Sequence, residues 1–87
     1  MALLGLGSVA HQEADYAGAQ RYYQQALDVN ADLADAHLGL GLAAAAAHED
    51  TLALTHLERF LQLAPESNQA EYARTGIMEI QSRQAQK

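Results

Sequence analysis

A recurrence with a period of 34 residues is the feature that most constrains how this chain of 87 residues folds. Residues 2–10 (ALLGLGSVA) align with residues 36–44 (AHLGLGLAA), and Ala, Leu, Gly, Leu, Gly and a final Ala are identical in place. The same offset pairs four further positions: Ala19 with Ala53, Tyr23 with Leu57, Leu27 with Leu61 and Val29 with Leu63. Self-similarity at a fixed period predicts a repeat architecture, in which neighbouring units bury apolar faces that none buries alone.

Apolar residues within each copy recur at the spacing of an α-helix. The first copy predicts a helix up to about residue 13 and another over about 16–29. The second predicts a helix over about 33–47 and a further one that ends before Pro65, and a last helix with one apolar face follows over about 67–84. The expected buried stripes are Ala19, Tyr22, Tyr23, Ala26 and Leu27, then Ala53, Leu57, Phe60, Leu61 and Ala64, then Ala70, Ala73, Ile77 and Ile80. We therefore predict an all-α fold, an antiparallel helix-pair solenoid of about five helices.

Acidic residues and a proline mark the expected helix ends. Asp15, Asp32 and either Glu49 or Asp50 precede predicted helices, where a carboxylate accepts hydrogen bonds from free backbone amides. Pro65 is expected to end the fourth helix and is able to open the next one.

Composition agrees with a helical fold and argues against several classes of function. Few residues are β-branched and one is proline, which favours helix over sheet. The chain has no cysteine, so disulfides and thiolate metal sites are excluded. The net charge is −6 and the five basic residues are scattered, so we expect no nucleic-acid partner and no attraction to anionic membranes.

The sequence also predicts no membrane insertion. No apolar run approaches the roughly 20 residues that a spanning helix needs. The apolar start, residues 1–10, lacks the basic region of a signal peptide and recurs at 36–44, so we interpret it as part of the fold. We expect a cytoplasmic location.

Two short motifs occur in both copies with the spacing of a known repeat family. They are Leu3-x2-Leu6-Gly7-x2-Ala10 with Ala19-x3-Tyr23, and His37-x2-Leu40-Gly41-x2-Ala44 with Ala53-x3-Leu57 and a final Pro65. At this period they make the chain resemble the tetratricopeptide repeat (TPR) family. The resemblance covers the whole chain and implies one domain, with repeats at 1–33 and 34–67 and a terminal helix at 68–87. The signature positions are Leu6, Gly7, Ala19, Tyr23, Leu40, Gly41, Ala53, Leu57 and Pro65.

The signature positions have physical roles in close helix packing. Gly7 and Gly41 let two helices approach because no Cβ lies between them, at a cost of about 1 kcal/mol of helix propensity each. Ala19 and Ala53 are small for the same reason. The larger signature side chains are expected to fill the space around the helix crossings: Leu6, Tyr23, Leu40 and Leu57.

Several positions depart from the family pattern and leave the local turn geometry open. The departures are Leu3 and His37 for the first aromatic, Ala14 and His48 for the glycine between paired helices, Ala31 for the proline that ends the first repeat, and Phe60 for a small residue.

The resemblance implies that a concave surface, lined by the first helix of each pair, binds a protein or peptide. The candidate groove residues are Leu4, Ser8, His11 and Gln12, then Leu38, Leu42 and Ala45, and finally Tyr72, Gly76 and Glu79. Leu38 and Leu42 independently support a binding surface, because they lie four apart on a helix whose other face is already apolar. Alternatively, both leucines pack against neighbouring helices.

The predicted function is therefore a non-catalytic scaffold that holds an apolar segment of another protein. A clamp for a C-terminal carboxylate is not expected, because the corresponding positions, such as Leu4 and Ser8, carry no cation. The alternative is a self-assembly module, since the first helix presents Ala2, Leu3, Leu4 and Leu6 at an open end. We expect that end to continue into further repeats of a longer protein or to pair with another copy, and favour the former.

No catalytic, cofactor or metal site is expected. The histidines are His11, His37, His48 and His56; no two are four apart on one helix, and we interpret them as partly exposed helix residues. The acidic pairs Glu13–Asp15 and Glu49–Asp50 lie near helix starts, where the helix dipole accounts for them. The Leu-Gly-Leu-Gly stretches follow no strand, so they are not phosphate-binding loops.

Overall fold

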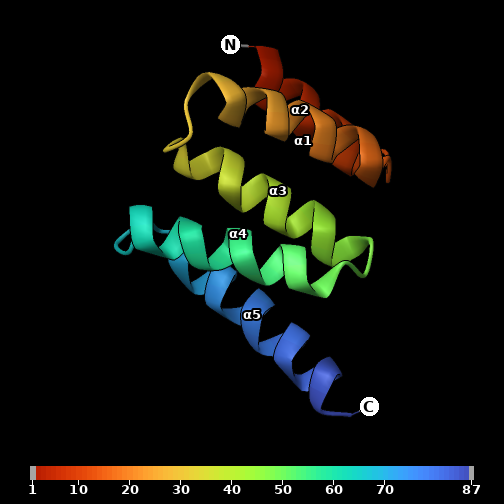
Figure 1. The fold of residues 1–87 in the computed structure, drawn as a ribbon, viewed down its shortest axis with the longest axis vertical. Coiled ribbons are helices and arrows are strands. Elements are labelled where there is room, and N and C mark those ends of the chain that lie inside the picture. Colours follow the sequence, from red (N-terminus) through yellow and green to blue (C-terminus); the bar gives the residue numbers. More distant parts are fainter. Residues whose placement is uncertain (1, 87) are drawn as a thin grey trace.

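Five α-helices joined by short loops make up residues 2–86, the part of the chain that the structure, a computed structural model, describes. They are α1 (Ala2–Gln12), α2 (Tyr16–Val29), α3 (Ala34–Ala46), α4 (Asp50–Leu63) and α5 (Ala70–Ala85). Successive helices pack antiparallel, and α3 lies in the middle, in contact with each of the other four (Figure 1). No strand occurs within residues 2–86, so the prediction of an all-α fold with five helices is confirmed. None of the described helices is long and apolar enough to cross a bilayer.

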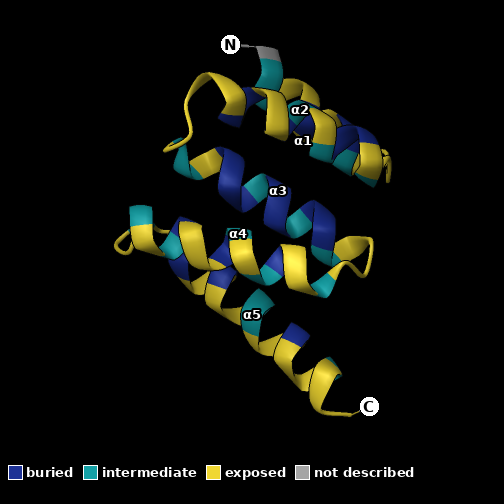
Figure 2. Ribbon diagram, in the orientation of Figure 1, coloured by how far each residue is buried: buried dark blue, intermediate teal, exposed yellow. Residues whose placement is uncertain are grey.

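Two apolar clusters hold the helices together, and α3 contributes to both (Figure 2). The first joins α1, α2 and α3 through Ala10, Ala19, Tyr23, Ala26, Leu27, Ala36, Leu40 and Ala43. The second joins α3, α4 and α5 through Leu38, Ala44, Ala53, Leu57, Phe60, Ala73 and Ile80. Phe60, Leu57 and Ile80 are the largest fully buried side chains, and burial of each stabilises the fold by about 1.5–3 kcal/mol.

The α1–α2 and α3–α4 turns have the same backbone geometry, 34 residues apart. Ala14 and His48 have φ angles of 63° and 62°, in the left-handed region that favours glycine. In each turn the amide of this residue donates to the carbonyl three residues earlier, at 2.9 and 3.1 Å. The next amide donates to the carbonyl five residues before it, at 2.8 Å in both turns. These bonds form the Schellman ending of a helix, at the two positions where the family pattern has glycine.

One of the predicted helix caps is confirmed. The carboxylate of Asp15 accepts a hydrogen bond from the amide of Gly18 at 3.0 Å, which caps α2. The prediction for Asp32 is wrong, because Leu33 takes the N-cap position of α3 and the Asp32 carboxylate pairs with Arg59 at 3.0 Å.

The predicted side-chain cap of α4 is also wrong. Glu49 takes the N-cap position, but its carboxylate accepts from the Gln20 side chain at 3.0 Å and makes no cap hydrogen bond. Asp50, the first residue of α4, forms an ion pair with Arg83 of α5. These acids therefore connect neighbouring helices and do not cap their own.

The loop between α4 and α5 is longer than the sequence predicts. α4 ends at Leu63, two residues before Pro65, as expected for a residue that excludes helix just before itself. The expectation that Pro65 opens the next helix is wrong, because α5 begins at Ala70. A turn precedes α5, in which the Ser67 hydroxyl accepts from the amide of Gln69 at 3.0 Å.

Glycines allow an aromatic ring from α2 to lie between α1 and α3. A Cβ added at Gly7 would lie 2.7 Å from the Cζ atom of Tyr23, and one added at Gly39 would lie 2.3 Å from the same atom. A Cβ at Gly41 would lie 2.8 Å from the Cγ atom of Leu57. These close approaches agree with the expected role of Gly7 and Gly41.

Leu6 does not have its expected role in packing. Its side chain is 43% exposed and that of Val9, on the same face of α1, is 50% exposed. The described helices in contact with α1 are α2 and α3, and they cover its other faces. The prediction that Leu6 fills a helix crossing is therefore wrong.

Candidate functional site

Seven of the ten predicted groove residues line two adjoining hollows, of about 260 and 210 Å³, on the side of the molecule formed by α1, α3 and α5. The first is lined by Leu4, Tyr23, Asp35, Leu38, Gly39, Leu42 and Gln69. The second is lined by Ser8, His11, Gln12, Tyr23, Gly39, Leu42 and Tyr72. Because Tyr23, Gly39 and Leu42 belong to both, the hollows form one surface, which we call the α1/α3/α5 groove.

The remaining three predicted residues lie outside this groove: Ala45, Gly76 and Glu79. Leu38 and Leu42 differ from each other. Leu38 is 5% exposed and belongs to the second core cluster, so for this residue packing against neighbouring helices is the correct interpretation. Leu42 is half-buried and lines both hollows, so it offers apolar surface to a ligand.

Tyr23 belongs to the first apolar cluster and also lines the groove, in keeping with its prediction as a core and groove-edge residue. It comes from α2, outside the three groove helices, and reaches the groove between Gly7 and Gly39. Burial raises the pKa of its hydroxyl above the usual 10.0. The ring is 8% exposed, and the residue lines both hollows. The sequence shows the two glycines, Gly7 and Gly39, in its first and third predicted helices. Only the fold shows that the Tyr23 ring lies against both of them.

The α1/α3/α5 groove has little charge. Among the described residues that line it, Asp35 is the one carboxylate, none is Lys or Arg, and the other polar side chains carry hydroxyls, amides and an imidazole. The imidazole, from His11, packs edge to face on Tyr16 with ring centroids 5.2 Å apart. Such a surface suits uncharged segments that combine apolar side chains with backbone hydrogen-bonding groups.

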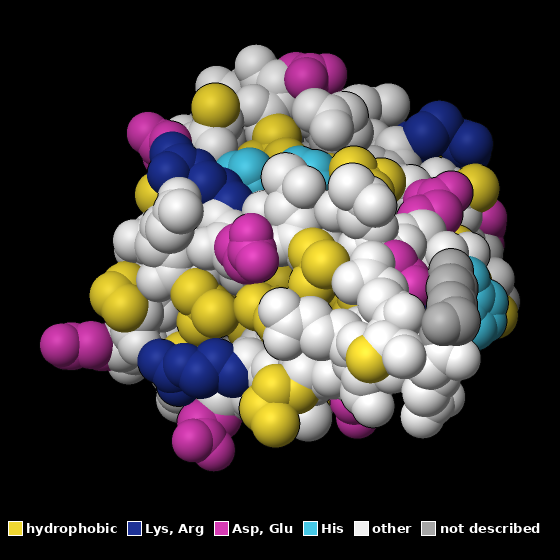
Figure 3. All heavy atoms as spheres, turned by 60° about the horizontal axis from the view of Figure 1, so that its bottom comes forward, with side chains coloured by type: hydrophobic (Ala, Val, Ile, Leu, Met, Phe, Trp, Pro, Cys, Tyr) yellow, Lys and Arg dark blue, Asp and Glu magenta, His cyan; other side chains and the backbone are white. Residues whose placement is uncertain are grey.

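Charged side chains elsewhere are dispersed. Figure 3, which brings the α5 end of the molecule forward, shows acidic and basic side chains scattered among apolar ones on that face. Two adjacent histidine side chains lie beside a basic side chain on the same face (Figure 3).

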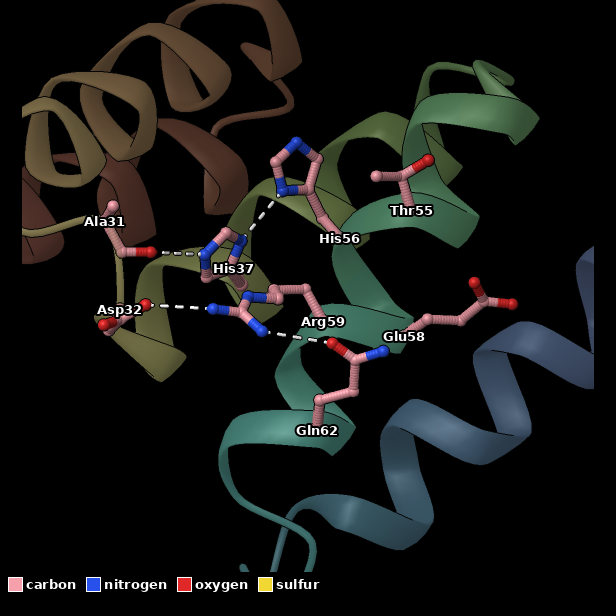
Figure 4. Close-up of a pocket in the computed structure, with 8 residues that line it drawn as sticks. All are labelled: Ala31, Asp32, His37, Thr55, His56, Glu58, Arg59 and Gln62. Carbon is pink, nitrogen blue, oxygen red and sulfur yellow. Dashed lines mark hydrogen bonds and ion pairs between the residues drawn. The ribbon is translucent and has the colours of Figure 1, made fainter.

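A second feature is a hydrogen-bonded pair of histidines from α3 and α4 (Figure 4). The Nδ1 atoms of His37 and His56 lie 3.0 Å apart, and the Nε2 atom of His37 lies 2.8 Å from the carbonyl oxygen of Ala31. The two rings are stacked, with centroids 5.2 Å apart. His37 is 8% exposed, so the prediction that all four histidines are partly exposed is wrong for this residue.

The hydrogen bonds assign the tautomers of both rings. A carbonyl only accepts, so His37 carries its proton on Nε2 and donates to Ala31. Its Nδ1 atom then accepts from the protonated Nδ1 of His56, and the Nε2 atom of His56 has the free lone pair. A proton added to that Nε2 leaves both hydrogen bonds in place.

The surroundings of the pair disfavour charge on His56. Burial, and to a smaller extent the nearby His37, hold the pKa of His56 below the usual 6.5. The pair lies in a hollow of about 500 Å³ whose other side chains include an ion pair, between Arg59 and Asp32 at 3.0 Å. The guanidinium of Arg59 also donates to Gln62 at 3.1 Å (Figure 4).

Within residues 2–86 no group of three or more histidines and carboxylates is placed to hold a metal ion. No protein-family model matches the chain, and no curated protein matches it at a significant level.

Proposed function

We propose that this chain is a non-catalytic protein-binding module of the TPR type, which holds a peptide segment of another protein in the α1/α3/α5 groove. The observation that carries the proposal is the placement of the predicted residues. Seven of them come from three helices and line one continuous surface: Leu4, Ser8, His11, Gln12, Leu38, Leu42 and Tyr72.

The recurrence of backbone geometry supports the TPR assignment. The two left-handed residues, Ala14 and His48, lie one period apart and end α1 and α3 with the same pair of hydrogen bonds. The close approaches at Gly7 and Gly41 are one period apart as well. Equal turns and equal contacts at the repeat distance are what stacked helix pairs require.

The chemistry of the groove supports an extended, largely uncharged ligand. Leu42 is half-buried and Tyr72 is 60% exposed, so both present apolar surface that a ligand side chain can cover. Ser8, Gln12 and Gln69 supply donors and acceptors for a peptide backbone. With Asp35 as the one charged lining residue, ligand affinity comes from apolar contact and neutral hydrogen bonds.

A displayed library of random peptides, selected on the full chain, tests the proposal. The tightest selected peptide is measured by fluorescence polarisation against variants Tyr72→Ala and Ser8→Arg. We expect each to weaken binding at least tenfold, about 1.4 kcal/mol, because an aromatic anchor is lost or the groove is obstructed.

Met78→Ala is the matched control for this experiment. Met78 lies on α5 like Tyr72 and is 67% exposed, but it lines neither hollow. We expect unchanged affinity for Met78→Ala and unchanged helical circular dichroism for all variants. Selected peptides that bind Tyr72→Ala and Ser8→Arg as tightly as the parent chain would refute the proposal.

A further inference from the structure

The outer face of α1 is apolar and uncovered in the described part of the chain. Leu6 is 43% exposed and Val9 is 50% exposed. A Cβ added at Gly5 would have no described neighbour within 4 Å. α1 contains no Asp, Glu, Lys or Arg. At 100° per residue, Leu6 points about 160° away from the groove residues Leu4 and Ser8, and Gly5 lies between the two faces.

The structure contains a covered counterpart of this face. One period later, the same positions on α3 are Gly39, Leu40 and Ala43, and α2 packs on them. Leu40 is 3% exposed and Ala43 is 0% exposed. The two faces have the same backbone spacing, and two of their three residues are identical.

The contact that α2 makes on α3 is centred on an aromatic ring. The Tyr23 ring lies against Gly39, where an added Cβ would be 2.3 Å from its Cζ atom. Ala19 and Ala26, four residues before and three after, are buried in the same cluster and let the helices approach. The position equivalent to Gly39 on α1 is Gly5, which has the same backbone opening without a ring beside it.

We propose that the outer face of α1 binds an amphipathic helix of a partner protein, with an aromatic residue seated on Gly5 and small residues four before and three after it. The occupant is defined by the contact between α2 and α3, which shows the side chains that fit this set of positions. Val9 occupies the position that Ala43 has on α3. Because valine is larger than alanine, we expect the partner helix to have a small residue opposite Val9.

A second copy of this chain does not offer such a helix. The aromatic-centred face of α2 is already buried on α3, and α4 is buried through Ala53, Leu57 and Phe60. The exposed aromatic of α5, Tyr72, has Glu71 beside it. The positions where small residues are needed are Thr75, which is polar, and Asn68, which precedes the helix. The observations therefore favour a different protein over self-association.

The probe for this proposal is a peptide of residues 15–30 of this chain, which includes α2 and its Asp15 cap. A hydrocarbon staple between Arg21 and Gln25, both exposed and four residues apart, keeps the peptide helical before it binds. We expect saturable binding to the full chain in fluorescence anisotropy, with amide shift changes in NMR confined to the outer face of α1. A peptide with Tyr23→Ala is expected to bind at least tenfold more weakly.

Two variants of the full chain complete the test. Gly5→Leu fills the seat, where an added Cβ has no described neighbour within 4 Å, and we expect it to weaken peptide binding at least tenfold. Tyr72→Ala, which is expected to weaken binding in the groove, is on α5 and is expected to leave binding of this peptide unchanged, so failure here is distinct from failure of the groove proposal. Absence of peptide binding, or full binding to Gly5→Leu, overturns the proposal. Sedimentation of the chain alone is the last measurement. If the parent chain is a dimer and the Leu6→Glu variant is a monomer, a second copy covers this face and the proposal is overturned.

Discussion

His37 satisfies both nitrogens of a buried ring with partners that are distant in sequence. Ala31 lies six residues before it and His56 lies 19 residues after it. Each bond depends on the other, because the proton that His37 donates to Ala31 leaves its Nδ1 atom free to accept from His56. Loss of either partner would leave a buried polar atom without a hydrogen bond, which costs about 1–3 kcal/mol.

The lowered pKa of His56 predicts a pH dependence of stability. Between the usual value of 6.5 and the lower folded value, the unfolded chain binds more protons than the folded chain. The contribution of His56 to the free energy of unfolding is therefore complete above about pH 6.5 and is lost as the pH falls through this window. We expect urea unfolding midpoints between pH 7.5 and 5 to fall more steeply for the parent chain than for His56→Gln. Equal slopes in the two proteins would contradict this prediction.

The sequence contained part of the information about this pair. His37 aligns with the aromatic position of the first motif, a sign that its ring is buried, although the sequence alone led us to expect partial exposure. The identity of its partner was not predictable, because one turn of α4 more or less would place a different side chain opposite His37. Seven of the ten groove residues were predictable, because the resemblance to the TPR family indicates which helix positions line a concave surface.

The turns after α1 and α3 are the elements in which the sequence fits the backbone least well. Ala14 and His48 adopt a left-handed conformation that costs a residue with a Cβ about 1–2 kcal/mol. The hydrogen bonds of the Schellman ending and the packing of the helix pairs on either side hold them there.

Glycine at these positions is expected to stabilise the fold. Ala14→Gly and His48→Gly relieve the left-handed strain, and part of the gain is offset by the greater freedom of glycine in the unfolded chain. We expect each to raise the free energy of unfolding by roughly 0.5–1 kcal/mol in chemical denaturation. Ala46→Gly, in the last turn of α3, is the control and is expected to lower it by about 0.5–1 kcal/mol. If all three variants are destabilised, the strain at the turns is not significant.

At the level of helices, sequence period was a better guide than local polar chemistry. The predicted range of α2 agrees with the observed Tyr16–Val29, because the apolar spacing and the Asp15 cap indicate the same boundaries. Asp32 and Asp50 were misassigned as caps because Arg59 and Arg83, 27 and 33 residues away, take their carboxylates. A cap is predictable from sequence when no donor from another helix, whether the guanidinium of an arginine or the amide of Gln20, takes its carboxylate.

For the molecule as a whole, α3 connects two cores that are otherwise separate. Ala36, Leu40 and Ala43 belong to the first cluster, and Leu38 and Ala44 belong to the second. Two apolar stripes on α3, one through Ala36 and Leu40 and the other through Leu38 and Leu42, were visible in the sequence. They explain why most of this helix is buried or half-buried (Figure 2). The exposure of the Leu6 side chain was not predictable, since it depends on which helices surround α1.

Hydrogen exchange is expected to reflect this central position. The amides of α3 should exchange most slowly, because opening this helix disrupts both apolar clusters, whereas opening α1 or the last turns of α5 disrupts one cluster at most. Native-state exchange followed by NMR at low denaturant measures the difference. Slower exchange in α1 than in α3 would show that the two clusters do not depend on α3 in this way.

The uncharged character of α1 has a consequence for how this molecule meets others in solution. All 11 acidic and five basic residues follow Gln12, so the net charge of −6 belongs to the rest of the chain. Like charges repel across about 8–10 Å at physiological ionic strength. An acidic macromolecule that diffuses toward this one is repelled least along the axis that leads to α1, and random collisions are thereby turned into a preferred orientation of approach.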